Sequence, residues 1–340
     1  MRLREIDFLR PILFIQLFLV HAFTIYTETS WPVPVGIVDV DSYDWIARLS
    51  YSCMLELFTF ISGYVYYFVS TKKESSLGEL FISKFKRLIV PSLVFSILYY
   101  WLLMDHSEVG IKLIYNIICG QGHLWYLPML FGCFIIAYFI KNTKKPGIFL
   151  IVACLISAFS RCPNVFRISQ IAYYFFFFIL GVFTCRYRHE VLSVFKQNFT
   201  PLALSISTLF ILSLVFLLPL NICLKEYSTD IWIEGYLMSA LIRFINIVYS
   251  VIGIAFWFFI SIRLSQCIST TPNWINQFNE LSMGVYIFHQ FVLMFLYYYT
   301  PLPSVCGSFI LPWVAILLTL PLSLLLSYLF RLSKFGKALM

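Results

Sequence analysis

The chain has 340 residues, of which 61% are hydrophobic and only 12% are charged, with a formal net charge of +8 and a mean hydropathy of +0.86. A water-soluble fold of this size cannot bury so much apolar surface, so the composition excludes a soluble enzyme or an ordinary globular domain. The cations are grouped in alternate loops rather than along one face, which argues against a nucleic-acid partner.

Apolar runs of about 20 residues, each long enough to cross ~30 Å of hydrocarbon, recur along the whole chain. We therefore predict an all-α polytopic membrane protein with no soluble domain, in which residues 1–340 form a single membrane domain. A short helix on the outer surface is expected over 109–122. The length rule gives about ten transmembrane helices, over 8–27, 46–70, 88–104, 124–140, 147–160, 169–185, 201–223, 238–262, 282–299 and 308–330.

The positive-inside rule assigns the basic segments to the cytoplasmic side, and an even number of spans puts both termini there as well. The outer loops over 28–45, 161–168, 224–237 and 300–307 are short, and we expect them to select any extracellular ligand. The inside segments carry Arg2 and Arg4; Lys72, Lys73, Lys84, Lys86 and Arg87; Lys141, Lys144 and Lys145; Arg186, Arg188 and Lys196; and Arg331, Lys334 and Lys337.

The first span contains three ionisable residues, Asp7, Arg10 and His21. The step from Arg10 to His21 is about three helical turns, which puts both side chains on one face with His21 on the order of 16 Å deeper in the membrane. Ionisable groups at that depth are costly and usually functional. For a lone histidine, a hydrogen bond that only holds the helix bundle together is the favoured interpretation, and Arg10 alone is equally compatible with a snorkelling topology marker. Arg10 and Asp7 on the same helix shift the weight toward function, because one helix then offers a cation, a carboxylate and a base.

The second span adds Glu56, a carboxylate that packing alone does not explain, and the pair Ser62–Gly63, for which small-residue helix packing is the favoured interpretation. In the following inside loop, Lys84, Lys86 and Arg87 precede Pro91, which we expect at a helix start. The positive-inside rule alone accounts for the positive charge of this loop, and the same charge can also pair with phosphate groups.

Two later segments combine histidine with aromatic residues. His123, Trp125 and Tyr126 lie at the outer start of the fourth predicted span, and Tyr286 and His289 lie in the ninth. Trp and Tyr at a membrane boundary are commonly anchors, whereas a second intramembrane imidazole again indicates function. The nine cysteines are scattered without zinc-type spacing, so we predict neither a metal site nor a disulfide framework.

Several of these segments resemble the integral-membrane acyltransferase 3 family. Its members carry an aspartate shortly before a Leu-Arg pair and a histidine eleven positions after that arginine, which Asp7, Arg10 and His21 match. Further matches are "ELFTFISGYVYYF", with Glu56 and Ser62; the basic motif "SKFKRLIVP", in which Lys84 replaces an arginine; "GQGHLWYLP", in which Tyr126 replaces a phenylalanine; and "LSMGVYIFHQF", with Ser282, Tyr286 and His289.

The resemblance implies transfer of an acyl group, most often acetyl, from cytoplasmic acyl-CoA to a carbohydrate hydroxyl outside the bacterial cytoplasmic membrane, with no permanently bound cofactor. It places the expected catalytic helices within 8–140 and 282–299. His21, with Arg10, Asp7 and Glu56, is expected to carry the chemistry, either as general base or by accepting the acyl group. The implied acyl-CoA contacts are Lys84, Lys86 and Arg87, and the implied acceptor or vestibule residues are Ser62, His123, Trp125, Tyr126, Tyr286 and His289.

Two other classes of function remain open at this point. A glycan transporter or flippase also uses intramembrane His and Glu, but the sequence has no visible inverted repeat and its ionisable residues gather in the first third of the chain. A non-catalytic scaffold or sensor is expected to depart from the family at the matched positions, and these are nearly intact. The acceptor, the acyl chain, the oligomeric state and any protein partner are not specified by the sequence.

Overall fold

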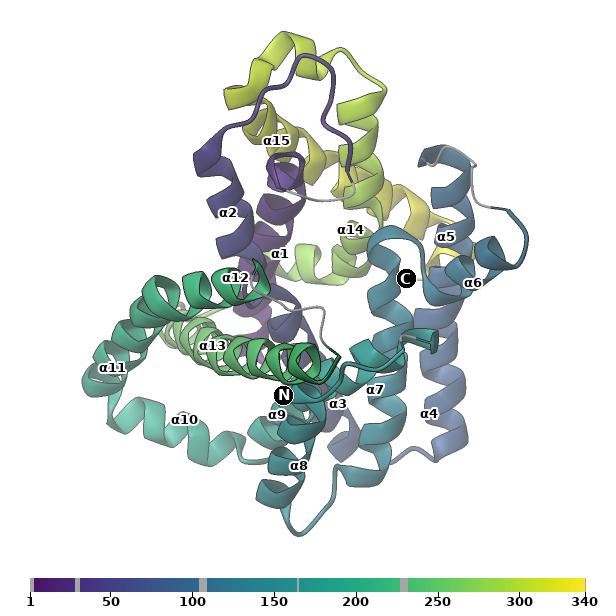
Figure 1. The fold of residues 1–340 in the computed structure, drawn as a ribbon. Coiled ribbons are helices and arrows are strands. Elements are labelled where there is room, and N and C mark those ends of the chain that lie inside the picture. The colour runs from purple at the N-terminus through teal and green to yellow at the C-terminus, as the bar shows by residue number, and fades with distance from the viewer. Residues whose placement is uncertain (1–2, 28–30, 104–108, 164, 227–231, 340) are drawn as a thin grey trace. The chain divides into compact units, whose positions relative to one another are not determined.

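The computed structural model describes residues 3–27, 31–103, 109–163, 165–226 and 232–339 (Figure 1). All regular structure in these residues is helical, with no strand, which confirms the predicted all-α polytopic membrane protein. Eight helical segments of the described chain are long and apolar enough to cross a membrane: Arg4–Tyr26, Asp41–Lys72, Gly122–Ile140, Val165–Arg186, Phe199–Lys225, Gly235–Cys267, Asn273–Tyr298 and Leu302–Leu332.

The two other predicted spans, 88–104 and 147–160, correspond to shorter helices, α5 (Val90–Leu103) and α8 (Pro146–Ala158). The chain is helical without a break from 77, through α4 (Leu77–Lys84) and η2 (Phe85–Ile89), so Pro91 does not begin the helix. The turn before Pro91 is instead a π turn. Proline has no N–H to donate to the carbonyl of Arg87, four residues earlier, and a widened turn is a known way for a helix to accommodate that loss.

The helices pack into two compact units, each made of segments from several parts of the sequence. Unit 1 comprises 1–9, 52–84 and 129–269. Its helices α11 (Phe199–Leu212) and α13 (Trp232–Cys267) pack against each other, and η5 (Ser213–Leu217) joins α11 to α12 (Leu218–Glu226). Besides α4, α8 and the start of α1, its helices are α3 (Met54–Lys72), most of α7 (Tyr126–Ile140), α9 (Ile168–Arg186), α10 (Arg188–Gln197), α11 (Phe199–Leu212), η5 (Ser213–Leu217), α12 (Leu218–Glu226) and α13 (Trp232–Cys267).

Within unit 1, α3 and α9 approach closely through two glycines. A Cβ atom on Gly63 would lie 1.9 Å from the carbonyl oxygen of Phe178, and one on Gly181 would lie 2.0 Å from that of Phe60. Both obstacles are backbone atoms of the opposite helix, so no side-chain rotation relieves them. The small-residue packing predicted for Ser62–Gly63 is therefore present at Gly63.

We expect Gly63→Ala to destabilise the protein by roughly 1–3 kcal/mol, because the added methyl group forces α3 and α9 apart. The free energy of unfolding in mixed detergent micelles measures this effect. The matched control is Gly78→Ala in α4, where nothing lies within 4 Å of the new Cβ. That control is expected to be neutral or slightly stabilising, since alanine is the better helix former. Equal stability of the two variants would contradict the close approach.

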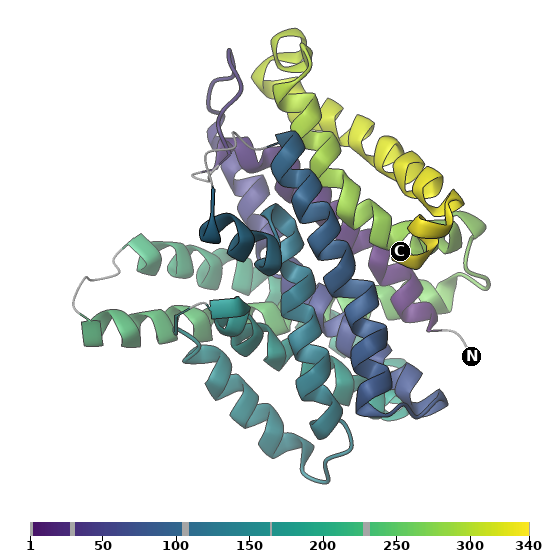
Figure 2. The same cartoon turned by 90° about the vertical axis from the view of Figure 1, so that its right-hand side faces the viewer.

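Unit 2 comprises 10–51, 85–128 and 270–340. Helices α14 (Asn273–Tyr298) and α15 (Leu302–Leu332) run side by side in it (Figure 2). The backbone of α15 leaves helical geometry at Gly307, whose φ is +64°. Besides η2 and α5, unit 2 contains the rest of α1 (Arg4–Phe23), η1 (Thr24–Tyr26), α2 (Asp41–Tyr51), α6 (Ile111–Cys119), η3 (Gly122–Trp125), α14 (Asn273–Tyr298), α15 (Leu302–Leu332) and α16 (Lys334–Leu339).

Segments that the sequence assigns to the same side of the membrane meet one another in both units. On the predicted inner side of unit 1, Arg186 Nη1 donates to the carbonyl of Thr143 at 2.6 Å. On the predicted outer side of unit 2, the Tyr298 hydroxyl donates to the carbonyl of Pro32 at 2.8 Å. These contacts agree with the charge-based topology. Residues 28–30, 164 and 227–231 of the predicted outer loops lie outside the described residues.

Candidate active site

Three histidines from separate parts of the sequence come together in unit 2. His21 lies near the end of α1, His123 in η3 and His289 in α14. The His289 ring packs edge to face against both others, with centroid distances of 4.8 Å to His21 and 4.9 Å to His123. The structure therefore places the candidate catalytic histidine in one cluster with the two histidines predicted for the vestibule.

The hydrogen bond of His21 fixes which of its ring nitrogens carries the proton. Nδ1 lies 3.0 Å from the carbonyl oxygen of Leu17, one turn earlier in α1. Because a carbonyl oxygen can only accept, Nδ1–H is the donor, and in the neutral ring Nε2 holds a free lone pair. His21 is half-buried, unlike the two other histidines, so it is the imidazole of the cluster that a substrate can reach.

The other two imidazoles are buried and fixed in the same way. His289 Nδ1–H donates to the carbonyl of Tyr286 at 2.6 Å, and His123 Nε2–H donates to that of Ile287 at 3.1 Å. The remaining nitrogens, His289 Nε2 and His123 Nδ1, have no hydrogen-bond partner among the described residues. Each ring of the cluster is thus held in one tautomer by a backbone carbonyl, with a lone pair on the opposite nitrogen.

The turn at Gly120, directly before η3, brings His123 into the cluster. Gly120 has a φ of +85°, and a Cβ there would lie 2.7 Å from the backbone of Leu124. The backbone N–H of His123 donates to Oε1 of Gln290 at 3.0 Å, and its carbonyl accepts from the Tyr286 hydroxyl at 2.5 Å. The glycines of "GQGHLW" therefore permit the turn, and α14 holds it in place.

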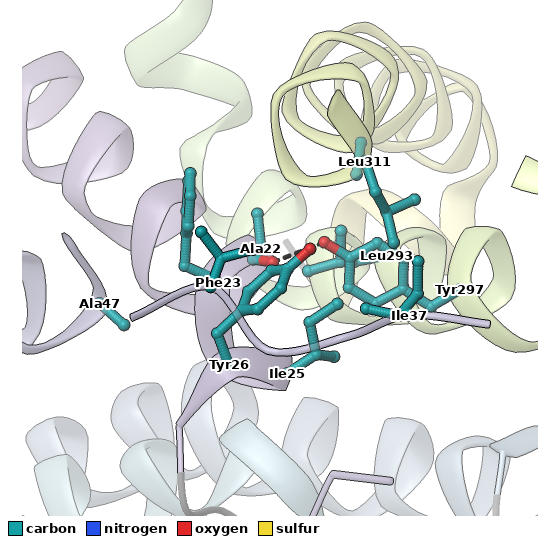
Figure 3. Close-up of a cluster of buried hydrophobic side chains, with 11 residues drawn as sticks. Ala22, Phe23, Ile25, Tyr26, Ile37, Ala47, Leu293, Tyr297 and Leu311 are labelled. Carbon is teal, nitrogen blue, oxygen red and sulfur yellow. Dashed lines mark hydrogen bonds between the residues drawn. The ribbon is translucent and has the colours of Figure 1, made fainter. Parts of the chain in front are cut away.

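A cluster of buried apolar side chains anchors the end of α1 directly after His21 (Figure 3). Ala22, Phe23 and Tyr26 pack there with Leu293 and other buried residues of unit 2. The hydroxyl of Tyr297, also in this cluster, donates to the carbonyl of Ala22 at 2.6 Å. The backbone that carries His21 is consequently tied to α14, the helix that carries His289.

Aromatic residues surround the histidines. The ring centroid of Trp31 lies 6.3 Å from that of His21. Tyr99, which the sequence analysis did not identify, has its ring centroid 6.3 Å from that of His123. The Tyr126 ring centroid lies 6.0 Å from that of Tyr286 and 6.2 Å from that of Trp125, and the vestibule role of these residues stays a prediction.

Gln290 was also missed. Gln290 is buried, and its side-chain oxygen accepts a hydrogen bond from the backbone N–H of His123. The sequence signal that could have found it is a polar residue inside a predicted span, next to His289 in "FHQF".

The predicted acidic and small residues of the second span belong to unit 1, whereas the histidines belong to unit 2. The buried Glu56 carboxylate accepts a hydrogen bond from the Tyr173 hydroxyl at 3.1 Å, and Asn246 donates to that hydroxyl at 2.7 Å. Ser62 Oγ donates within its own helix, to the carbonyl of Phe58 at 2.9 Å. The expected role of Glu56 toward a histidine or an acceptor therefore stays a prediction.

The remaining predicted residues lie on α1 and near the π turn. Asp7 is buried and Arg10 half-buried on α1, the helix that also carries His21. Lys86 and Arg87 are exposed, and the ammonium of Lys84 lies 4.0 Å from the centre of the Phe134 ring, in a cation–π contact. The proposed role of these three residues in binding a phosphate-bearing donor stays a prediction.

No set of three or more His, Cys, Asp or Glu side chains in the described chain is placed to hold a metal ion. The fold and the cluster together define a polytopic helical membrane protein with a histidine-centred site. The Acyltransferase domain model of the acyltransferase 3 family matches residues 3–332, so the chain belongs to this family. It is a membrane acyltransferase. No curated protein and no solved structure matches it significantly.

Proposed function

We propose that this membrane acyltransferase moves an acyl group, most often acetyl, from cytoplasmic acyl-CoA to a hydroxyl of a glycan on the outer side of the bacterial cytoplasmic membrane. O-antigen, exopolysaccharide and capsule are acceptors of this class. The observation that supports the proposal most strongly is the hydrogen bond from His21 Nδ1–H to Leu17, since it leaves Nε2 of the reachable imidazole as a base.

The proposed reaction needs one proton acceptor. As the glycan oxygen attacks the thioester carbonyl, its proton passes to His21 Nε2, a C–O bond forms, the C–S bond breaks, and the coenzyme A thiolate leaves and takes up a proton. In the alternative route Nε2 itself attacks the carbonyl, and the acyl-imidazole then passes the group to the hydroxyl. Both routes use the same lone pair, so the tautomer of His21 is compatible with either.

The neighbouring groups are proposed to serve this step by position. His289 packs against His21, with His123 on His289, and is proposed to exclude water from one side of the His21 ring, while Trp31 offers an apolar face on which a sugar ring can stack. Lys86 and Arg87, which are exposed on the predicted inner side, are proposed to attract the anionic donor to that side, with Arg10 at the inner end of the same helix as His21.

A transfer assay separates this proposal from transport. The purified protein, reconstituted in proteoliposomes, receives acetyl-CoA labelled in the acetyl group together with a lipid-linked or soluble glycan acceptor. We expect label in the glycan as an alkali-labile ester, in an amount that grows with the protein present. A glycan that crosses the membrane without gaining label would support the flippase alternative and contradict the proposed transfer.

A further inference from the structure

Unit 1 contains a pair of cavities outside the histidine site, where the start of α1 meets α10 and the end of α13. Their volumes are about 300 Å³ and about 510 Å³. They share four lining residues, Arg4, Lys196, Ser265 and Gln266. Because the N-terminal segment and the 186–196 segment are both predicted on the inner side, these cavities belong to the side from which acyl-CoA is supplied.

The cavities carry an excess of positive charge. Arg4, Arg188, Lys196 and Arg263 line them, against the single carboxylate of Glu5. Glu5 is already paired, since Arg188 donates to both of its oxygens at 2.6 and 3.1 Å and the Tyr64 hydroxyl donates at 2.9 Å. The charges of the three other cations are therefore available to an anion.

The shared cation Arg4 is only partly satisfied. One of its terminal nitrogens donates to the carbonyl of Ile268, which is uncharged. Its Nε is buried and has no hydrogen-bond partner within the described residues. Lys196 and Arg263 are exposed at the cavity wall. A guanidinium with an unmatched donor beside two exposed cations is suited to a phosphate group, which accepts several hydrogen bonds at once.

The larger cavity also has a flat wall. Phe199 lines it and stacks on Phe259, with centroids 5.3 Å apart and planes inclined by 21°. The guanidinium carbon of Arg263 lies 4.5 Å from the centre of the Phe199 ring. Planar cationic and aromatic groups stack well on a nucleobase, and Ser265 and Gln266 supply hydrogen-bonding groups for its edge.

From this combination of three available cations, a stacking surface and polar side chains, we infer that the cavity pair binds the phosphate-bearing nucleotide end of the acyl-CoA donor. The inference rests on the proposed function. Phospholipid headgroups offer the same phosphate chemistry but have no base to stack on Phe199 or Arg263. The donor's pantetheine arm would then be free to carry the thioester away from this anchor.

Calorimetric titration of the full-length protein in nanodiscs of neutral lipid tests the inference, with coenzyme A and 3′-dephospho-coenzyme A as probes. We expect the double variant Lys196→Gln/Arg263→Gln to bind coenzyme A about ten-fold or more weakly, as loss of charge-assisted contacts predicts. The wild type should bind 3′-dephospho-coenzyme A more weakly than coenzyme A. The ratio of the wild-type to the variant affinity should also be smaller for 3′-dephospho-coenzyme A than for coenzyme A. The matched control is Lys144→Gln, an exposed lysine of another inner loop, with affinity unchanged.

Unchanged affinity of the double variant for coenzyme A would overturn the inference. Native mass spectrometry of the same proteins with phosphatidylglycerol tests the lipid source: loss of retained lipid with intact coenzyme A binding would assign the cavities to a headgroup and refute the donor assignment. If the wild type transfers labelled acetyl and the double variant keeps its KM for acetyl-CoA, only this inference fails. A wild type that neither binds coenzyme A nor transfers label would refute the proposed function.

Discussion

Replacement of His21 by alanine is expected to lower acyl transfer by about 10²–10⁴-fold, the range found when a positioned general base is removed. In cells this loss should leave the surface glycan without its ester, which mass spectrometry of the released glycan measures directly. The reason is chemical, because the variant lacks the reachable lone pair on Nε2. The side chain is half-buried and its hydrogen bond stays within α1, so folding should survive.

The matched control for this prediction is His189→Ala. His189 is exposed on α10 and belongs to unit 1, so its loss should leave the ester content unchanged. Both variants should reach the membrane in equal amounts and unfold at the same temperature in detergent. If cells with the His21→Ala protein produced a fully esterified glycan, His21 would not take part in the transfer reaction, whatever the result for His189→Ala.

Loss of Arg188 is expected to cause the largest fall in stability. Its side chain is 16% exposed and that of Glu5 3%, and the Glu5 carboxylate raises the pKa of Arg188 above its ordinary value by accepting its hydrogen bonds. Arg188→Met leaves a buried carboxylate without its partner, which typically costs about 3–5 kcal/mol. The free energy of unfolding in mixed micelles measures this loss. Glu5→Gln/Arg188→Met, with neither charge, should recover most of the stability.

The exposed pair Asp44–Arg48 provides the comparison. These side chains are 27% and 36% exposed and lie four residues apart on α2. Solvent screens such a pair, so Arg48→Met should cost no more than about 1 kcal/mol. If Arg188→Met lowered the free energy of unfolding no more than Arg48→Met does, the buried Glu5–Arg188 pair would not be a major stabilising contact between α1 and α10.

Much of the site could be anticipated because its chemistry is local in the sequence. A histidine in an apolar span is conspicuous, and His21, His123 and His289 each stand in a recognisable motif. Their edge-to-face contacts join residues more than 100 positions apart, which no local pattern specifies. The partners that fix the tautomers are backbone carbonyls, which carry no sequence signal of their own.

The misses have physical causes. Arg188 is one of several cations that the positive-inside rule already explains, so nothing in the sequence distinguishes it as the partner of the buried Glu5 carboxylate. The helix that contains Pro91 begins at Leu77, before the predicted membrane boundary, whereas the span rule counts only residues in hydrocarbon. For the same reason α14 begins at Asn273 rather than at the predicted 282. Apolar length predicts spans, but not how far helices extend beyond them.

The most direct measurement is the single-turnover rate of acetyl transfer in proteoliposomes, with the purified protein in excess over labelled acetyl-CoA and with glycan acceptor present. We expect the wild-type and His189→Ala proteins to form one labelled ester for each donor consumed. The rate for His21→Ala should be about 10²–10⁴-fold lower. Equal single-turnover rates for the wild-type and His21→Ala proteins would contradict the claim that the acyl group passes to its acceptor with the help of this imidazole.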